Sequence, residues 1–207
     1  MGWVYGPLPA QHAYQSNLRR SIMLKLFAAI MLPRMIARDV IREQKGVSGA
    51  KWVSEEKLHI TLGFFGEVNP DHAELLDQEL ATLHAGSFEL ELKGGGHFGS
   101  TEPHAIWAGV GPSEDLIRLH KHCRHAARRA GVQMEARNFL PHVTMAYMRP
   151  RSPLERIIAF EQRMADFKTR SFLVDQFSLV SSHAKKRGAN LYREEAVFPL
   201  LGEGVVP

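Results

Sequence analysis

The sequence has little cysteine and no long apolar run. Cys123 is the one cysteine among 207 residues. A single thiol cannot form an internal disulfide or a cysteine-rich metal site, so the count favours a reducing compartment. The most apolar stretch, residues 24–32, is interrupted by Lys25 and followed by Pro33, and it falls well short of the roughly 20 residues that a membrane-spanning helix needs. These absences predict a cytoplasmic protein that does not use a membrane.

Acidic residues are missing from the first 22 positions, which include Arg19 and Arg20. The same stretch has no apolar segment of the kind found in a secretory signal. We expect residues 1–22 to form a disordered N-terminal extension, with Met23 as the natural first residue of the folded part. Residues 23–207 then form a single domain, because no linker long enough to separate two independent domains follows.

The overall composition is that of a globular protein, with 44% hydrophobic and 23% charged residues. This length is sufficient for one ordinary domain or two small lobes. The formal charge is +4 and the pI is about 9.3, which favours an anionic partner.

Short strands alternate with helices along the chain. Helices are predicted to begin at Pro33, at the cap Asn69, at the cap Ser113 and, by a capping box in "SPLE", at Ser152. Strands are predicted for "LKLFAAI", "FELELKG", "AIWAGV", "FLVDQFSLV" and "LYREEAVFPL", with Gly94–Gly96 as a connection. Because several strands are successive and some alternate apolar with polar residues, the order favours an α+β fold with largely antiparallel sheets.

A seven-residue pattern of similar residue types occurs twice, as "LHITLGF" at residues 58–64 and "PHVTMAY" at residues 141–147. About 0.3 His-x-Thr triplets are expected by chance from this composition, so two within matching contexts indicate an internal duplication. Since side chains at i and i+2 of a strand share a face, His59 projects with Thr61, and His142 with Thr144. The alternate positions, through Phe64 and Tyr147, are expected to face a core.

Two imidazoles and two hydroxyls on one surface fit displacement at phosphorus. Imidazole titrates near neutral pH, so one ring can accept a proton from water while the other protonates the leaving oxygen. Threonine hydroxyls can donate hydrogen bonds to the phosphate oxygens as charge builds there. Such a mechanism needs no metal.

At these residues the chain resembles the 2H phosphoesterase superfamily, and within it the RNA 2′,3′-cyclic phosphodiesterase family, once named 2′-5′ RNA ligase. The resemblance extends over "LKLFAAIMLP", "KWVSEEKLHITLGFFGEV", "AIWAGV", "RNFLPHVTMAY" and "FSLVSSHAKKRGANLY". It implies a bilobal, pseudo-twofold α+β fold, with two mainly antiparallel sheets lining a central groove and helices outside. It also implies opening of a 2′,3′-cyclic phosphate at an RNA end to a 2′-phosphate, with no cofactor.

Carried over by motif, the resemblance makes His59 the proton donor and His142 the proton acceptor, with Thr61 and Thr144 on the phosphate. The expected partner is RNA or an oligonucleotide with a cyclic phosphate end, tRNA fragments among the candidates, and the expected state is a monomer. The alternatives are 2′-5′ ligation, hydrolysis of a small cyclic nucleotide, and a non-catalytic module that binds nucleotides or RNA.

The chain departs from the family pattern in the flanks of the motifs. Leu140 and Tyr147 replace polar or basic residues, and Met31 stands where an aspartate is usual. Arg137 and Arg149 are near enough in sequence to supply the missing charge. These two arginines and Tyr147 are candidate substrate contacts. Phe65 is another, because strict alternation places it on the face of His59, where it could stack on a base.

Other noticeable segments have ordinary alternatives. In "RLHKHCRHAARR" only His122 and His125 have a spacing that could share a metal, and a basic face for RNA or a plain solvated face are the other interpretations. Lys185, Lys186 and Arg187 could contact phosphate or simply form a hairpin tip. Trp107 is predicted to be a core residue.

Overall fold

The computed structural model describes residues 23–200 except 101, 137, 151 and 186–188. The predicted N-terminal extension lies outside this range. The elements are β1 (Leu24–Met31), α1 (Arg34–Arg42), β2 (Lys51–Trp52), the 3-10 turn η1 (Glu55–Lys57), β3 (His59–Val68), α2 (Pro70–Ala81), β4 (Phe88–Leu90), β5 (Leu92–Phe98), β6 (Ala105–Val110), α3 (Glu114–Arg129), β7 (His142–Tyr147), α4 (Leu154–Met164), β8 (Phe172–Val174), β9 (Gln176–His183) and β10 (Leu191–Pro199).

Most strands belong to one sheet with the order β10-β9-β1-β3-β7-β6-β5, and β2 adds to β7. A second, two-stranded sheet consists of β4 and β8. The pairs between these strands are antiparallel. This confirms the predicted α+β class with mainly antiparallel sheets. The halves of the large sheet join through one residue pair, Ile60 with Val143, so β3 and β7 diverge on either side of it.

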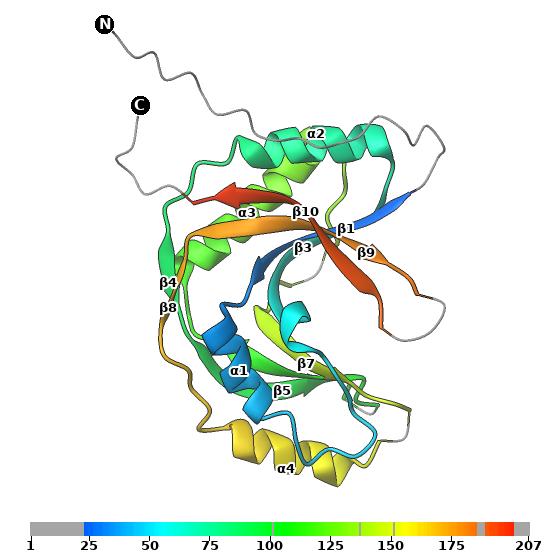
Figure 1. Cartoon of the computed structure of the whole chain (residues 1–207), viewed down its shortest axis with the longest axis vertical. Helices are drawn as coiled ribbons and strands as arrows, with labels where there is room; N and C mark the ends of the chain where they lie inside the picture. Colours follow the sequence, from blue (N-terminus) through cyan, green and yellow to red (C-terminus); the bar gives the residue numbers. More distant parts are fainter. Residues whose placement is uncertain (1–22, 101, 137, 151, 186–188, 201–207) are drawn as a thin grey trace, which may run out of the picture.

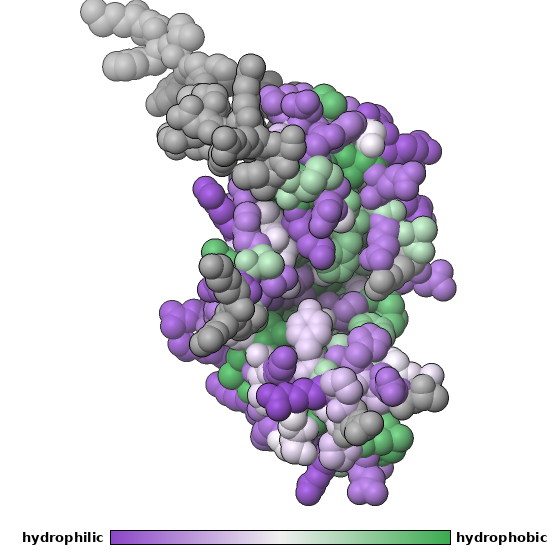
Figure 2. Space-filling model, turned by 90° about the vertical axis from the view of Figure 1, so that its right-hand side faces the viewer, coloured by the Kyte–Doolittle hydropathy of each residue, from purple (hydrophilic) through white to green (hydrophobic). Residues whose placement is uncertain are grey.

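The single β3–β7 contact divides the molecule into two lobes (Figure 1). The upper lobe in that view contains β1, β9 and β10 with α2 and α3, and the lower lobe contains β5 and β7 with α1 and α4. Helices α2 and α3 pack on each other, α3 packs on β3, and α4 packs on β5. Figure 2, which looks onto the right-hand side of Figure 1, shows the surface recessed between the lobes. We call this recess the groove.

Strand β1 is buried on both faces, as its continuous apolar sequence predicts. Leu26, Ala28 and Ile30 belong to the main core. Phe27 and Ala29 point the other way and form a small cluster with Val180, edged by Met31 and Tyr192. This cluster supports the groove face of the upper lobe.

Two helix starts follow their predicted caps and one does not. Asn69 Oδ1 accepts a hydrogen bond from the His72 amide, and Ser113 Oγ accepts one from the Leu116 amide, as caps do. The capping box at Ser152 is wrong, because α4 begins only at Leu154. The Ser152 hydroxyl instead donates to the carbonyl of Arg149.

The glycines at 94–96 are part of a strand and not a connection, which corrects the prediction. They belong to β5, and a Cβ on Gly96 would come within 2.5 Å of the Trp107 ring. The missing side chain therefore gives the indole its place on the sheet. The predicted "FELELKG" and "FLVDQFSLV" strands each break once, at Glu91 and Asp175, which leaves β4 and β8 free to pair with each other.

Candidate active site

Both repeated motifs lie on the groove side of the two central strands. The β3–β7 pair joins Ile60 to Val143. His59 and Thr144 flank this antiparallel pair on one side, and Thr61 and His142 flank it on the other. All four side chains are half-buried. Residues of the opposite face are at most 1% exposed, as alternation predicts: Leu58, Ile60, Leu62, Val143 and Met145.

The two histidines are oriented by the same kind of hydrogen bond to the backbone. Nδ1 of His59 lies 2.7 Å from the carbonyl oxygen of Lys57, and Nδ1 of His142 lies 2.7 Å from that of Leu140. A carbonyl can only accept a hydrogen bond, so Nδ1 carries the hydrogen in each ring. In the neutral imidazole Nε2 then has a free lone pair for proton transfer.

Burial lowers the pKa of both rings below the ordinary value of 6.5. For His59, removal from water is the largest cause, the bond to Lys57 opposes it, and the charge of His142 lowers the pKa further. For His142, burial again dominates, and the bond to Leu140 opposes it. Burial disfavours the charged form of an imidazole, so both rings favour the neutral form more than a free histidine does.

Each motif strand has an irregularity directly after its threonine. The β1–β3 register skips Leu62, and the β6–β7 register skips Met145. A bulge of this kind adds one residue and reverses the facing of the side chains that follow. As a result Phe64 and Tyr147 are 46% and 51% exposed, although strict alternation directs them into the core.

The same bulge contradicts the expectation for Phe65. This side chain is only 5% exposed and belongs to the main core. Phe64 takes the place on the face of His59 that Phe65 was predicted to occupy. Because a bulge has no distinct composition, strict alternation is wrong here for residues 64 and 65 and for Tyr147.

An aromatic group surrounds His59. The Phe27 ring centroid lies 5.1 Å from the imidazole and that of Tyr192 lies 5.6 Å away, edge-on. Phe64 lies 5.5 Å from Phe27. Burial raises the pKa of Tyr192 to about 12, helped by the charge of Tyr147 and a side-chain hydrogen bond with it. This bond links β10 of one lobe to β7 of the other.

A different aromatic pair surrounds His142. Phe98 meets the imidazole edge-on at 4.7 Å, and Trp107 lies tilted at 6.3 Å. Trp107 was predicted to be core, yet it is half-buried beside Thr144 in the β6–β7 register. Its Nε1 atom is buried without a hydrogen-bond partner among the described residues. The alternation in "AIWAGV", with Ile106 and Ala108 buried, is the signal that could have placed Trp107 on the groove face.

The remaining predicted contacts are further from the motifs or outside the described residues. Arg149 is exposed two residues after Tyr147. Arg137, Lys186 and Arg187 are outside the described part of the chain, and Lys185 is exposed. The Leu140 side chain is exposed, while its carbonyl holds His142.

The histidine-rich helix α3 shows no metal site. Cys123 is fully buried, and burial raises its pKa to about 12, as expected for a packing residue. His120 is buried and bonded to the backbone of β3. Within the described ranges no three His, Cys, Asp or Glu side chains converge as a metal site requires. No helix of the same ranges is long and apolar enough to cross a membrane.

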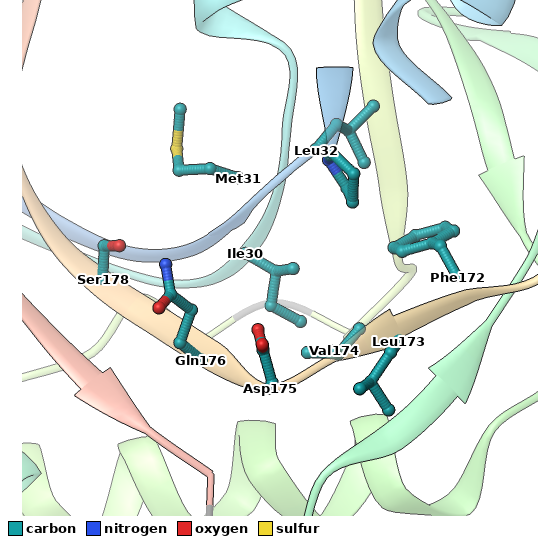
Figure 3. A pocket seen from close by; sticks show the side chains of 10 residues that line it. Ile30, Met31, Leu32, Phe172, Leu173, Val174, Asp175, Gln176 and Ser178 are labelled. Carbon is teal, nitrogen blue, oxygen red and sulfur yellow. The ribbon is translucent and has the colours of Figure 1, made fainter. Parts of the chain in front are cut away.

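A cavity of about 240 Å³ lies beside the motifs, between the end of β1 and the β8–β9 junction (Figure 3). Its lining includes Met31, the register partner of His59. Met31 and Ile30 point to opposite sides of β1 in this view. None of the four motif residues lines the cavity, so the candidate site is the groove face of β3 and β7.

Comparison with known proteins agrees with this geometry. Residues 32–186 match the model of the 2′-5′ RNA ligase superfamily. The chain is 31% identical over 140 residues to an RNA 2′,3′-cyclic phosphodiesterase of Aeropyrum pernix, covering 67% of this chain and 80% of the relative. It is 32% identical over 139 residues to one of Thermotoga maritima, covering 65% and 71%.

Solved structures show the same likeness. Escherichia coli LigT complexed with 3′-AMP matches with a TM-score of 0.71 and 25% identity, over 86% of this chain and 99% of that one. TT0787 of Thermus thermophilus matches with a TM-score of 0.67 and 27% identity, over 86% and 99%. The match to the family model covers most of the chain: the chain belongs to the 2′-5′ RNA ligase superfamily of 2H phosphoesterases.

Proposed function

We propose that this enzyme hydrolyses 2′,3′-cyclic phosphates at RNA or oligonucleotide ends to 2′-phosphates, without a metal. The observation that carries the proposal is the pair of histidines on neighbouring strands, each with Nδ1 bonded to a carbonyl and Nε2 left for proton transfer. The names of the relatives and the basic charge of the chain support an RNA substrate.

In the proposed reaction a water oxygen attacks phosphorus and the bond from phosphorus to the 3′ oxygen breaks. Nε2 of His142 accepts a proton from the water, and the protonated Nε2 of His59 gives one to the departing 3′ oxygen. The phosphate remains on the 2′ oxygen. His59 must be charged for this step, and a bound phosphodiester anion between the rings favours that form despite the lowered pKa.

Thr61 and Thr144 complete the proposed phosphate site. Thr61 and Thr144 follow Ile60 and Val143, the residues of the β3–β7 pair, on the same strands as the two histidines. Each can donate one hydrogen bond to a non-bridging oxygen, where negative charge builds in the transition state.

Aromatic side chains supply the proposed outer contacts. Phe64 and Tyr147 are exposed on the groove face, and single-stranded RNA is commonly bound by stacking of bases on such rings. Arg149, and Arg137 outside the described residues, remain candidates for a neighbouring phosphate. The proposed enzyme acts as a monomer in the cytoplasm.

The test is turnover of an oligonucleotide with a 2′,3′-cyclic phosphate end in the presence of EDTA. We expect wild type to be active, and His59→Ala and His142→Ala each to lose on the order of 10² to 10⁴ in rate, the usual value of a general acid or base. His122→Ala on α3 is the matched histidine control. An inactive wild type, or undiminished turnover by both groove variants, would refute the proposal.

A second candidate is hydrolysis of a small cyclic nucleotide. It is favoured by the LigT structures that carry 3′-AMP or ATP. A comparison of kcat/KM for a cyclic mononucleotide and for a long RNA end separates the two. Equal values would place all of the recognition at the terminal nucleotide, while a higher value for RNA would indicate contacts beyond it.

A further inference from the structure

His120 lies outside the groove on α3, yet it contacts the first motif and a residue just before the second. The residue is 8% exposed. Its Nδ1 lies 2.7 Å from the carbonyl oxygen of Leu62. Its ring stacks on Phe139, with centroids 4.0 Å apart and planes 12° from parallel. Leu62 follows Thr61 directly, and Phe139 precedes His142 by three residues.

Leu62 has no register partner in either neighbouring strand, and its carbonyl is bonded to the His120 ring. The β1–β3 register skips Leu62 and, further along, Phe65. On the other edge, β3 pairs with β7 only at Ile60. A buried carbonyl without a donor is costly, and the imidazole N–H of His120 supplies the donor. His120 therefore holds the bulge that turns Phe64 toward the groove.

Residues between α3 and β7 contact β3 directly after the first motif. The Glu135 amide donates to the carbonyl of Phe64 at 2.9 Å. Met134 packs on Gly63, where a Cβ would come within 2.2 Å of the sulfur. Phe139, just before the second motif, stacks on the His120 ring. The bulge of β3 and the start of β7 are thus fixed to each other around one imidazole.

The other lobe holds its corresponding carbonyl differently. Met145, the skipped residue of β7, has its carbonyl bonded to the Val53 amide at 2.9 Å and to Nε2 of Gln44 at 3.3 Å. Loss of Gln44 leaves the backbone donor in place. Loss of His120 removes the side-chain donor of Leu62 and the ring on Phe139 together.

We propose that His120 is a positioning residue, which sets the first motif relative to the second so that both histidines reach one phosphate. This inference rests on the proposed function. His120 lies on α3, outside the groove, so the proposed role is indirect. It acts through Leu62, next to Thr61, and through Phe139, near His142.

Three variants separate positioning from simple stability. His120→Phe keeps a ring on Phe139 but removes the donor, and His120→Asn keeps a donor at the place of Nδ1 but removes the ring. Gln44→Leu is the matched control in the other lobe. Each is compared with wild type by thermal unfolding, and kcat and KM for the cyclic-phosphate oligonucleotide are expressed per folded molecule.

We expect kcat of His120→Phe to fall roughly 10- to 100-fold, as small displacements of catalytic groups do, with a smaller change in KM. His120→Asn should recover most of the loss, and Gln44→Leu should stay within about threefold of wild type, because Val53 still donates. A His120→Phe enzyme with wild-type kcat would overturn the inference. So would equal losses in His120→Phe and Gln44→Leu, or an Asn variant no better than Phe.

A second measurement does not depend on turnover. Inorganic phosphate is titrated while the ring-proton NMR signals of His59 and His142 are followed. In wild type both signals should move over one range of phosphate concentration, whereas in His120→Phe they should separate or need more phosphate. If wild type fails to respond, the proposed function fails; if wild type responds and His120→Phe behaves identically, only the role of His120 fails.

Discussion

The two halves of the groove share a backbone design and differ in their surroundings. In both, a histidine is bonded through Nδ1 to the carbonyl two residues earlier, and a bulge after the threonine exposes an aromatic residue. Around His59 lie Phe27 and Tyr192, whereas around His142 lie Phe98 and Trp107. The repeat therefore provides two similar proton-transfer groups, and the neighbouring strands make them unequal.

This inequality matters because the proposed reaction needs one acid and one base. The hydrogen bond that orients His59 is partly buried, while that of His142 is exposed. Burial disfavours the charged imidazole more where water is more fully excluded. Water is thus excluded more fully at His59, the proposed acid, so its charged form depends on the bound phosphate anion, while the more open side at His142 leaves room for an attacking water.

The largest expected effect beyond the histidines concerns the two threonines. Thr61→Val and Thr144→Val keep the shape but remove the hydroxyl donor, and each should lower kcat by about 10²-fold, as loss of a transition-state donor does. Single-turnover rates measure this directly. Equal losses would indicate a symmetric phosphate site, and an unequal pair would show which half holds the oxygen that gains more charge. Unchanged rates in both would remove the threonines from the phosphate site.

The pH dependence of kcat/KM tests a feature that the two halves share, the lowered pKa of their histidines. Burial lowers the pKa of both His59 and His142 below 6.5, and the active form carries one proton on the pair. That form is most populated between the two pKa values, so the optimum should lie below pH 6.5. Activity should then decline above it by roughly tenfold per pH unit once the acid has lost its proton. A plateau that continues above pH 8 would contradict the lowered pKa of the acid.

The smallest expected effect on activity comes from Phe64, which faces the groove, and it contrasts with that of the adjacent core residue Phe65. Phe64→Ala should raise KM about fivefold, the lower end of the range for a base stacked on an aromatic ring, with little loss of stability. Phe65→Ala should leave KM unchanged and lower the free energy of unfolding by about 3 to 5 kcal/mol, as for a buried phenylalanine. Kinetics and denaturant unfolding of the two variants check this. The reverse pattern would restore strict alternation.

Much of the site could be predicted from the sequence because period-two alternation holds up to each threonine. It places His59, Thr61, His142 and Thr144 on one face and their neighbours in the core. Alternation fails one residue later, where the bulges lie, because a bulge is set by pairing with β1 and β6. Because of the bulge in β3, Phe64 lies on the groove face and Phe65 in the core, the opposite of the prediction.

The aromatic surroundings were missed for a related reason. Phe27, Phe98 and Tyr192 come from strands distant in sequence, and only the strand order brings them to the histidines. Sheet order is a long-range property that local patterns do not encode. The predicted capping box at Ser152 is wrong because the Ser152 hydroxyl donates its hydrogen bond to the backbone carbonyl of Arg149 and not to the helix.

The most direct test of unequal halves is rescue by a better leaving group. A 2′,3′-cyclic substrate with sulfur in place of the 3′ oxygen releases a thiolate, which needs little protonation because thiols are far more acidic than alcohols. Rates of His59→Ala and His142→Ala are compared on the sulfur and oxygen substrates. If His59 is the acid and His142 the base, the sulfur substrate should restore His59→Ala toward wild type and leave His142→Ala impaired. Rescue of His142→Ala alone, or equal rescue of both, would contradict this account.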